Sequence, residues 1–217
     1  MERPTLIIGN RNYSSWSLRA WLTLEATEQK FTEVLIPLGQ DNTSEEILGW
    51  SPTARVPALK DGEIFLWDSL AICEYLAEAF PEAGLWPIDA RARATARSVV
   101  AEMHSGFVAL RKHMPMNLRA SYPIADHEPG VADDIARITE IWEECRMHFG
   151  ADGDLLFGGF TIADAFYAPI VSRFRTYGVS PGGIAGEYMD AVWALPAMQD
   201  WAEKARAEEW CVGRYDR

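Results

Sequence analysis

The chain has 217 residues, nearly half of them hydrophobic, and a formal net charge of −12. This length allows one large or two small domains, and the composition excludes a disordered chain. The negative charge argues against nucleic acid and anionic membranes as partners, because both attract basic surfaces. No apolar run approaches the ~20 residues that a membrane-spanning helix needs.

The three cysteines, Cys73, Cys145 and Cys211, are widely spaced and form neither a CxxC motif nor an even set for disulfides. This usage is typical of a reducing compartment. The start "MERPTLIIGN" has too short an apolar run for a signal peptide. We therefore expect a cytoplasmic protein, and we expect no metal site.

The first 80 residues alternate between strand and helix patterns. The predicted elements are a strand over 5–9, a helix over 15–27, a strand over 31–38, a helix over 43–50, strands over 56–59 and 64–66, and a helix over 69–80. An Asp-Gly pair between the last two strands predicts a hairpin turn. Pro81 ends the last helix. The order is therefore βαβαββα.

Only helical patterns follow. They cover residues 88–118, 131–149, 161–177, 187–193 and 196–208. We expect an α/β domain over 1–80, a linker with Pro and Gly over 81–88, and an all-helical domain over 89–217.

The stretch "YSSWSLR" at residues 13–19 places several hydroxyls where a helix begins. A helix start has unpaired N–H groups and about half a positive charge. Hydroxyls there can cap the helix, and they can also donate hydrogen bonds to an anion. Four hydroxyls within residues 13–17 exceed what capping requires.

Two further motifs favour peptide recognition. The Val56–Pro57 bond is a candidate cis peptide that leaves the Val56 backbone open to an extended peptide, although an ordinary edge-strand proline is the alternative. Asp68 and Ser69 stand at the start of a predicted helix, where they could act only as a helix cap. Alternatively, Ser69 and the helix N–H groups could bind the carboxylate of an amino-acid end while Asp68 binds its ammonium. Together the motifs predict a cradle for a short anionic peptide with a free amino-acid terminus.

The segments "ARVPALKDGEIFLWDSLAICEYLAE" and "TIADAFYAP" resemble the cytosolic glutathione transferases, and the resemblance covers nearly the whole chain. "SSWSLR" is similar to the "SSCSxR" signature of the zeta class. The resemblance implies a thioredoxin-like N-terminal domain and a C-terminal helical bundle. It also implies glutathione as co-substrate and a homodimer.

The resemblance assigns roles at the helix start. The catalytic residue of the Ser- and Cys-type classes lies five positions before an arginine, here Arg19, so the thiolate-ionising role falls on Ser14. Ser15 would donate a second hydrogen bond. Which of the two is the primary donor stays open, and Tyr13 is a further candidate.

The resemblance also assigns the glutathione-binding residues. Val56 would pair with the cysteinyl backbone beside cis Pro57, and Asp68 with Ser69 would hold the γ-glutamyl end. The assignment for the glycyl carboxylate is open: candidates are Arg55 and Gln40.

Four residues on the predicted helix 88–118 fall at i, i+4, i+8 and i+11: Met103, Phe107, Arg111 and Met114. They could wall a pocket for the second substrate, and core or dimer packing is the alternative. Arg173 and Arg175 could attract a substrate carboxylate or form surface ion pairs.

Near the end of the chain, Trp210 and Tyr215 could cover the pocket or fix the tail. The "TIAD" motif predicts a structural capping box between Thr161 and Asp164.

The expected function is that of a glutathione transferase in which the thiolate attacks a small electrophile. A zeta-like cis-trans isomerase of the maleylacetoacetate type is an alternative, but Trp16 stands where the zeta signature has cysteine. Asp68 likewise stands where other members have Glu or Gln. A non-catalytic binding protein of the same fold is the third possibility.

Overall fold

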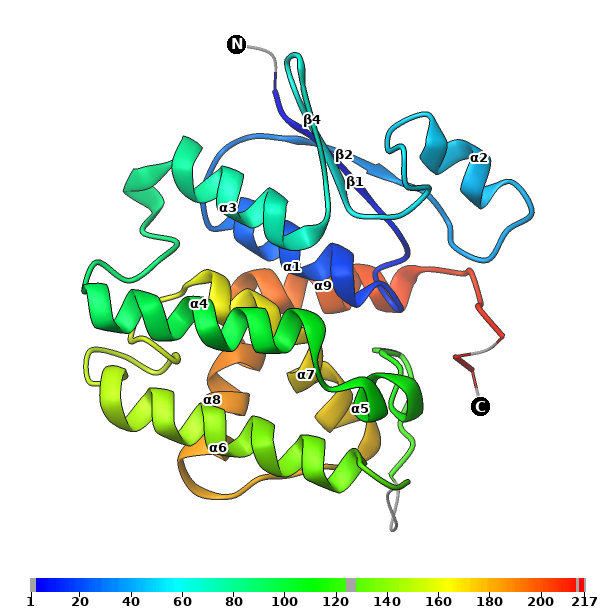
Figure 1. The fold of residues 1–217 in the computed structure, drawn as a ribbon. Coiled ribbons are helices and arrows are strands. Elements are labelled where there is room, and N and C mark those ends of the chain that lie inside the picture. The colour runs from blue at the N-terminus through cyan, green and yellow to red at the C-terminus, as the bar shows by residue number, and fades with distance from the viewer. Residues whose placement is uncertain (1–2, 124–127, 214, 217) are drawn as a thin grey trace.

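The computed structural model describes residues 3–123, 128–213 and 215–216. Figure 1 shows a sheet with its helices stacked on a larger set of helices. The first part contains β1 (Thr5–Ile8), α1 (Ser15–Glu25), β2 (Thr32–Leu35), α2 (Thr43–Leu48), β3 (Ala58–Asp61), β4 (Ile64–Trp67) and α3 (Ser69–Ala79). The predicted order βαβαββα is confirmed.

The four strands form one sheet in the order β2-β1-β3-β4. β1 pairs with β2 in parallel, with Ile7 opposite Val34, whereas β3 runs antiparallel to both β1 and β4. This mixed sheet is the expected thioredoxin-like arrangement. Because β3 lies beside β1, the segment that precedes β3 comes close to the start of α1.

The two faces of β1 are covered by different helices. Side chains alternate along a strand, so Leu6 and Ile8 point to one face and Ile7 to the other. Leu6 and Ile8 join the core that contains residues of α1 and α3, while Ile7 packs with Ile47 of α2. The sheet is thus buried on both faces, which fixes where α1 begins.

The second part is helical. It contains η1 (Pro81–Ala83), α4 (Ala90–Ser105), α5 (Val108–His113), α6 (Val131–Phe149), α7 (Ile162–Tyr177), α8 (Gly183–Ala194) and α9 (Pro196–Ala207). α7 is buried on nearly all sides and contacts α1, α4 and α8. The α7–α1 contact joins the two parts of the molecule.

The prediction of one helix over 88–118 is wrong. α4 ends at Ser105, Gly106 caps it, and Phe107 adopts a left-handed conformation with φ of 56° before α5 begins. A side chain at position 106 would lie 2.7 Å from the Glu102 carbonyl oxygen, so this close approach requires glycine. The break turns α5 toward the start of α1.

The predicted capping box at the start of α7 is confirmed. The Asp164 carboxylate accepts hydrogen bonds from the Thr161 N–H at 2.8 Å, from the Thr161 hydroxyl at 3.0 Å and from the Leu156 N–H at 3.1 Å. Asp164 is fully buried, so these bonds compensate for its lost hydration. Among the described residues, no helix is long and apolar enough to cross a membrane.

Candidate active site

The start of α1 places two hydroxyls at the boundary between the two parts of the molecule. Ser14 is the N-cap of α1 and Ser15 is its first residue, and both are almost buried. The Ser14 hydroxyl donates to Ser17 Oγ at 2.7 Å, and its oxygen accepts from the Ser17 N–H at 3.3 Å. Ser15 Oγ instead accepts from Arg173 Nη2 at 3.2 Å.

A cavity of about 410 Å³ opens above these hydroxyls. Its lining comes from α1, the α2 region, the segment before β3, the end of α5, α7 and the C-terminal tail. The residues that bear on its chemistry are Tyr13, Ser14, Ser15, Trp16, Arg55, Val56, Arg111, Arg173 and Tyr215. The cavity therefore combines hydroxyls with positive charge in a cleft between the two parts.

A second hollow of about 450 Å³ is lined by Thr53, Val56, Pro57, Asp68 and Ser69, together with Trp16, Arg55 and Trp67. The Val56–Pro57 peptide is cis, as the sequence predicts. Within the described chain, no hydrogen bond involves the Val56 backbone, which leaves its N–H and C=O available to a ligand. The hollow shares Trp16, Arg55 and Val56 with the cavity above Ser14 and Ser15, so the two adjoin.

The start of α3 forms one wall of this second hollow. Asp68 has a positive φ of 74°, and its Oδ1 accepts from the N–H groups of Leu70 and Ala71. Its Oδ2 lies 3.4 Å from His104 Nε2 of α4. The Ser69 hydroxyl is buried and has no partner in the described part of the chain. An unpaired polar group next to a hollow is a binding feature, because burial without a partner costs free energy.

Gln40 and Arg55 differ in position. The Arg55 side chain is exposed and lines both hollows, whereas Gln40 is exposed and lines neither. The Gln40 N–H is bonded to Thr43 Oγ1 at 2.9 Å within its own loop. Of the two candidates for a ligand carboxylate, the geometry favours Arg55.

Three arginines contact the first two residues of α1, Ser15 and Trp16. The guanidinium of Arg19 lies 4.4 Å and that of Arg111 lies 5.1 Å from the indole centroid, and Arg173 is bonded to Ser15. None of the three forms an ion pair with another described residue. Burial lowers the pKa of Arg173 to about 10, with Arg111 contributing, so its guanidinium stays charged at neutral pH. Burial, with Arg111 and Arg173, also lowers the pKa of Arg19.

The four residues predicted to share one helix face do not do so, because the break at Gly106 separates them. Met103, Phe107 and Met114 are buried in the core, and none of them lines either hollow. Arg111 does line the cavity, and it donates to the carbonyl oxygens of Met103 and His104. The structure therefore places three of the four in the core and one at the cavity.

Two further pairs are resolved by the structure. Arg173 lines the cavity, whereas Arg175 points away, with its guanidinium 4.4 Å from the Trp193 ring and 3.8 Å from Asp190. Tyr215 also lines the cavity, whereas Trp210 is partly exposed and lines neither hollow.

The C-terminal tail is tied to the segment before α1. The Tyr13 hydroxyl donates to Asp216 at 2.8 Å and accepts from Arg119 Nη2 at 2.7 Å. The Glu208 carboxylate accepts from the N–H groups of Arg11 and Asn12 at 2.7 and 3.1 Å. Because its hydroxyl hydrogen is directed to Asp216, Tyr13 is the weakest of the three candidate donors.

These tail contacts were missed from the sequence. They join residues between 106 and 203 positions apart, and no local motif marks Glu208 or Arg119. Across the ranges that the structure describes, no group of three or more His, Cys, Asp or Glu side chains could hold a metal ion.

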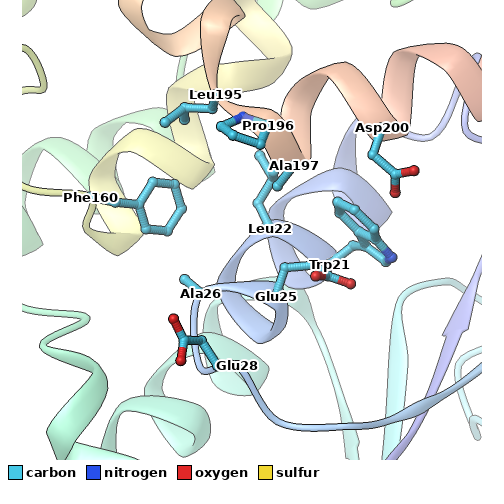
Figure 2. Close-up of a pocket in the computed structure, with 10 residues that line it drawn as sticks. All are labelled: Trp21, Leu22, Glu25, Ala26, Glu28, Phe160, Leu195, Pro196, Ala197 and Asp200. Carbon is cyan, nitrogen blue, oxygen red and sulfur yellow. The ribbon is translucent and has the colours of Figure 1, made fainter.

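A third hollow, of about 530 Å³, lies between α1 and the start of α9 and contains none of the predicted site residues (Figure 2). Phe160, Leu195 and Pro196 lie on one side of it, and Glu25 and Asp200 lie at its other end. Asp200 is already bonded to Lys204 at 2.7 Å. Its lining contains no hydroxyl and no arginine, whereas the two adjoining hollows contain both.

A thioredoxin-like domain with an open backbone edge at cis Pro57 is joined to a helical domain across a hydroxyl-bearing cavity, which is the architecture of a two-domain protein with a cleft between its domains. The comparisons agree. The family model "Glutathione S-transferase, N-terminal domain" matches residues 13–79, and "Glutathione S-transferase, C-terminal domain" matches residues 89–204. The chain belongs to the glutathione S-transferase family, as its motifs indicated.

Similar proteins point to the zeta class. The chain is 26% identical to glutathione S-transferase Z2 of Arabidopsis thaliana over 202 residues, or 87% of this chain and 88% of that protein. It is 36% identical to maleylacetoacetate isomerase of Rattus norvegicus over 110 residues, about half of each chain. A glutathione transferase homolog from Burkholderia gl BGR1, solved with bound glutathione, has a TM-score of 0.72 at 23% identity, covering 96% of this chain and all of that one.

Proposed function

We propose that this chain is a glutathione transferase that binds glutathione across the two adjoining hollows and presents its thiolate to an electrophile. The observation that best supports this proposal is that the two hollows are continuous. The open Val56 backbone lines both of them, with Asp68 and Ser69 in one hollow and the hydroxyls of Ser14 and Ser15 in the other. Family membership and the glutathione-bound neighbour support this choice of ligand.

Each part of glutathione has a matching group in this arrangement. The Val56 backbone pairs with the cysteinyl residue, and the Asp68 carboxylate receives the γ-glutamyl ammonium. The unpaired Ser69 hydroxyl, at the N-terminus of α3, receives the γ-glutamyl carboxylate. Arg55 reaches the glycyl carboxylate.

The start of α1 supplies the chemistry. A free thiol has a pKa near ~8.5, and lowering it by about two units requires ~2.7 kcal/mol of preferential thiolate stabilisation. A hydroxyl hydrogen bond, the helix dipole and the arginines near Trp16 act in that direction. The S–H proton leaves to water, and the sulfur electron pair forms the new bond to the electrophile as the leaving group departs.

The second substrate is proposed to carry a carboxylate. Arg111 and Arg173 line the cavity as cations without ion-pair partners in the described chain, and an anionic electrophile compensates their charge. A carboxylate-bearing substrate also fits a second candidate function, that of a glutathione-dependent cis-trans isomerase. The similarity to the rat maleylacetoacetate isomerase supports this alternative. There the thiolate adds to a double bond and later leaves. The bulk of Trp16 beside the hydroxyls favours the transferase.

The first test is glutathione binding by calorimetry. Wild type should bind glutathione, and Asp68→Asn should bind it about tenfold or more weakly, because a charged hydrogen bond is worth ~1.5–3 kcal/mol. Asn retains the helix cap, so α3 should stay intact.

Glu78→Ala, which removes an exposed carboxylate near the other end of α3, is the matched control and should bind like wild type. Absence of glutathione binding by wild type would exclude both enzymatic functions and leave a non-catalytic binding protein. If wild type binds, rates of conjugation to carboxylated electrophiles and of maleylacetoacetate isomerisation separate the two enzymes.

A further inference from the structure

The two serines at the start of α1 have different hydrogen-bonding capacity. The Ser14 hydroxyl hydrogen is already given to Ser17 Oγ, and the Ser14 oxygen accepts from the Ser17 N–H. Ser17 Oγ in turn accepts from the Gly9 N–H at 3.1 Å, which ties α1 to the end of β1. Ser14 is therefore occupied as the N-cap of α1, and a ligand could use its hydrogen only by breaking this chain of bonds.

Ser15 has the opposite arrangement. Its oxygen accepts from Arg173, and no described residue accepts its hydroxyl hydrogen. Ser15 lines the cavity, so that hydrogen is available to an anion there. A hydroxyl whose oxygen accepts from a cation is a stronger donor, because hydrogen bonds in a chain polarise one another.

Arg173 is held in place for this contact. Its Nε donates to the Met114 carbonyl oxygen at 2.8 Å and its Nη1 to the Pro169 carbonyl oxygen at 3.3 Å, which leaves Nη2 directed to Ser15. The side chain is buried and has no carboxylate partner in the described part of the chain. Its charge is thus uncompensated next to the cavity, where a thiolate would stabilise it.

We propose that Ser15, rather than the helix-capping Ser14, donates the hydrogen bond that holds the glutathione thiolate, and that Arg173 positions and polarises this hydroxyl. This inference rests on the proposed function. The step is a simple ionisation: the S–H bond breaks, the proton passes to water, and the electron pair stays on sulfur. The sequence resemblance assigns the same role to Ser14.

The test is the pKa of the bound glutathione thiol, measured by thiolate absorbance across pH at saturating glutathione. Ser15→Ala should raise this pKa by at least about one unit, which is a tenfold decrease in the ionisation constant of the bound thiol. Ser14→Ala should raise it by clearly less while lowering the melting temperature, because its main loss is the cap of α1. The reverse order of the two shifts would overturn the inference.

Arg173 is tested with a charge-matched control on the same helix. Arg173→Met should raise the thiol pKa in the wild-type background but add little to Ser15→Ala, because the two residues act through one hydrogen bond. Arg175→Met, which removes a guanidinium directed away from the cavity, should leave the pKa unchanged. Equal shifts from both arginines, or full additivity of Arg173→Met with Ser15→Ala, would contradict the positioning role.

Binding of S-methylglutathione separates the two hypotheses. It has no thiol to ionise, so Ser15→Ala should bind it as wild type does. If wild type binds neither S-methylglutathione nor glutathione, the proposed function fails and the inference fails with it. If wild type binds both and the Ser14 variant shows the larger pKa shift, only the inference fails.

Discussion

The Asp68 carboxylate caps α3, lies close to a histidine and is proposed to bind the ammonium of glutathione. One carboxylate oxygen caps α3, and the other lies 3.4 Å from His104 Nε2. Burial lowers the pKa of His104 below 6.5, Asp68 opposes this shift, and Arg19 and Arg111 add to it. Trp16 and Phe166 contribute the aromatic surfaces that contact the ring. His104 is therefore neutral at neutral pH and brings no positive charge to Asp68, which leaves the Asp68 carboxylate open to a ligand cation.

This arrangement predicts a pH dependence of binding. His104 gains a proton only below 6.5, and the resulting cation competes with the ligand ammonium for Asp68. The affinity for S-methylglutathione should therefore fall as the pH is lowered from about 7 to about 5, a range in which the ligand itself barely titrates.

His104→Gln should remove most of this dependence in calorimetric titrations. His148→Gln, on an exposed part of α6, should keep it. A His104→Gln variant that retains the full wild-type pH dependence would show that another group is responsible.

Individual residues were predictable where the signal is local. The Val56–Pro57 bond and the Asp68–Ser69 helix start are short motifs whose geometry depends on adjacent residues. Arg173 and Arg175 were not separable, because α7 is buried on nearly every side and its sequence lacks a polar face that would orient it. The contacts of Trp16 with Arg111 and His104 depend on tertiary packing alone.

At the scale of elements, the order of the N-terminal strands and helices followed from periodicity and turn residues. The break between α4 and α5 did not, because the hydrophobic spacing continues across Gly106 and the sequence marks the interruption with one glycine. Packing of α5 beside α6 decides it, with the Leu110 N–H bonded to Asp134 of α6 at 2.9 Å.

The capping box of α7 predicts a stability effect without a binding effect. Thr161→Ala should lower the free energy of unfolding by about 1–2 kcal/mol, because the cap of a buried helix is lost. Asp164→Ala should cost more, since it leaves the buried N–H of Leu156 without its partner.

Denaturant unfolding measures both effects, with Ser98→Ala, at an exposed position of α4, as a control that should stay within about 0.5 kcal/mol of wild type. Glutathione affinity should be unchanged in the folded variants. A Thr161→Ala protein as stable as wild type would contradict the structural role.

The whole molecule presents an apolar edge on its sheet. Ile64, Phe65 and Trp67 of β4 are exposed by 43%, 49% and 45%, beside a hollow of about 570 Å³ that includes Leu70 of α3. An unpartnered edge strand with several exposed hydrophobic side chains is a typical association surface.

We propose that two copies of the chain form a homodimer through this face. The apolar residues here predict a strand, but the sequence alone does not show that their side chains are exposed, because exposure depends on how β4 packs in the folded protein.

The dimer can be tested by sedimentation. Wild type should sediment as a dimer, and Phe65→Asp should raise the dissociation constant by about 30-fold or more, since central aromatic contacts are often worth ~2 kcal/mol. Leu48→Asp, at an exposed leucine of α2, should remain dimeric. A monomeric wild type, or a dimer that Phe65→Asp leaves intact, would exclude this interface.

The position of Tyr215 and Asp216 beside the cavity has a practical consequence for handling the protein. Asp216 bonds to Tyr13 and Tyr215 lines the cavity, so this part of the tail lies beside the proposed thiolate site. An affinity tag at this end would alter the access of the electrophile and the measured rates. β1 begins at Thr5, on the far side of the sheet domain from the tail in Figure 1, so a tag at the N-terminal end is the better choice for kinetic work.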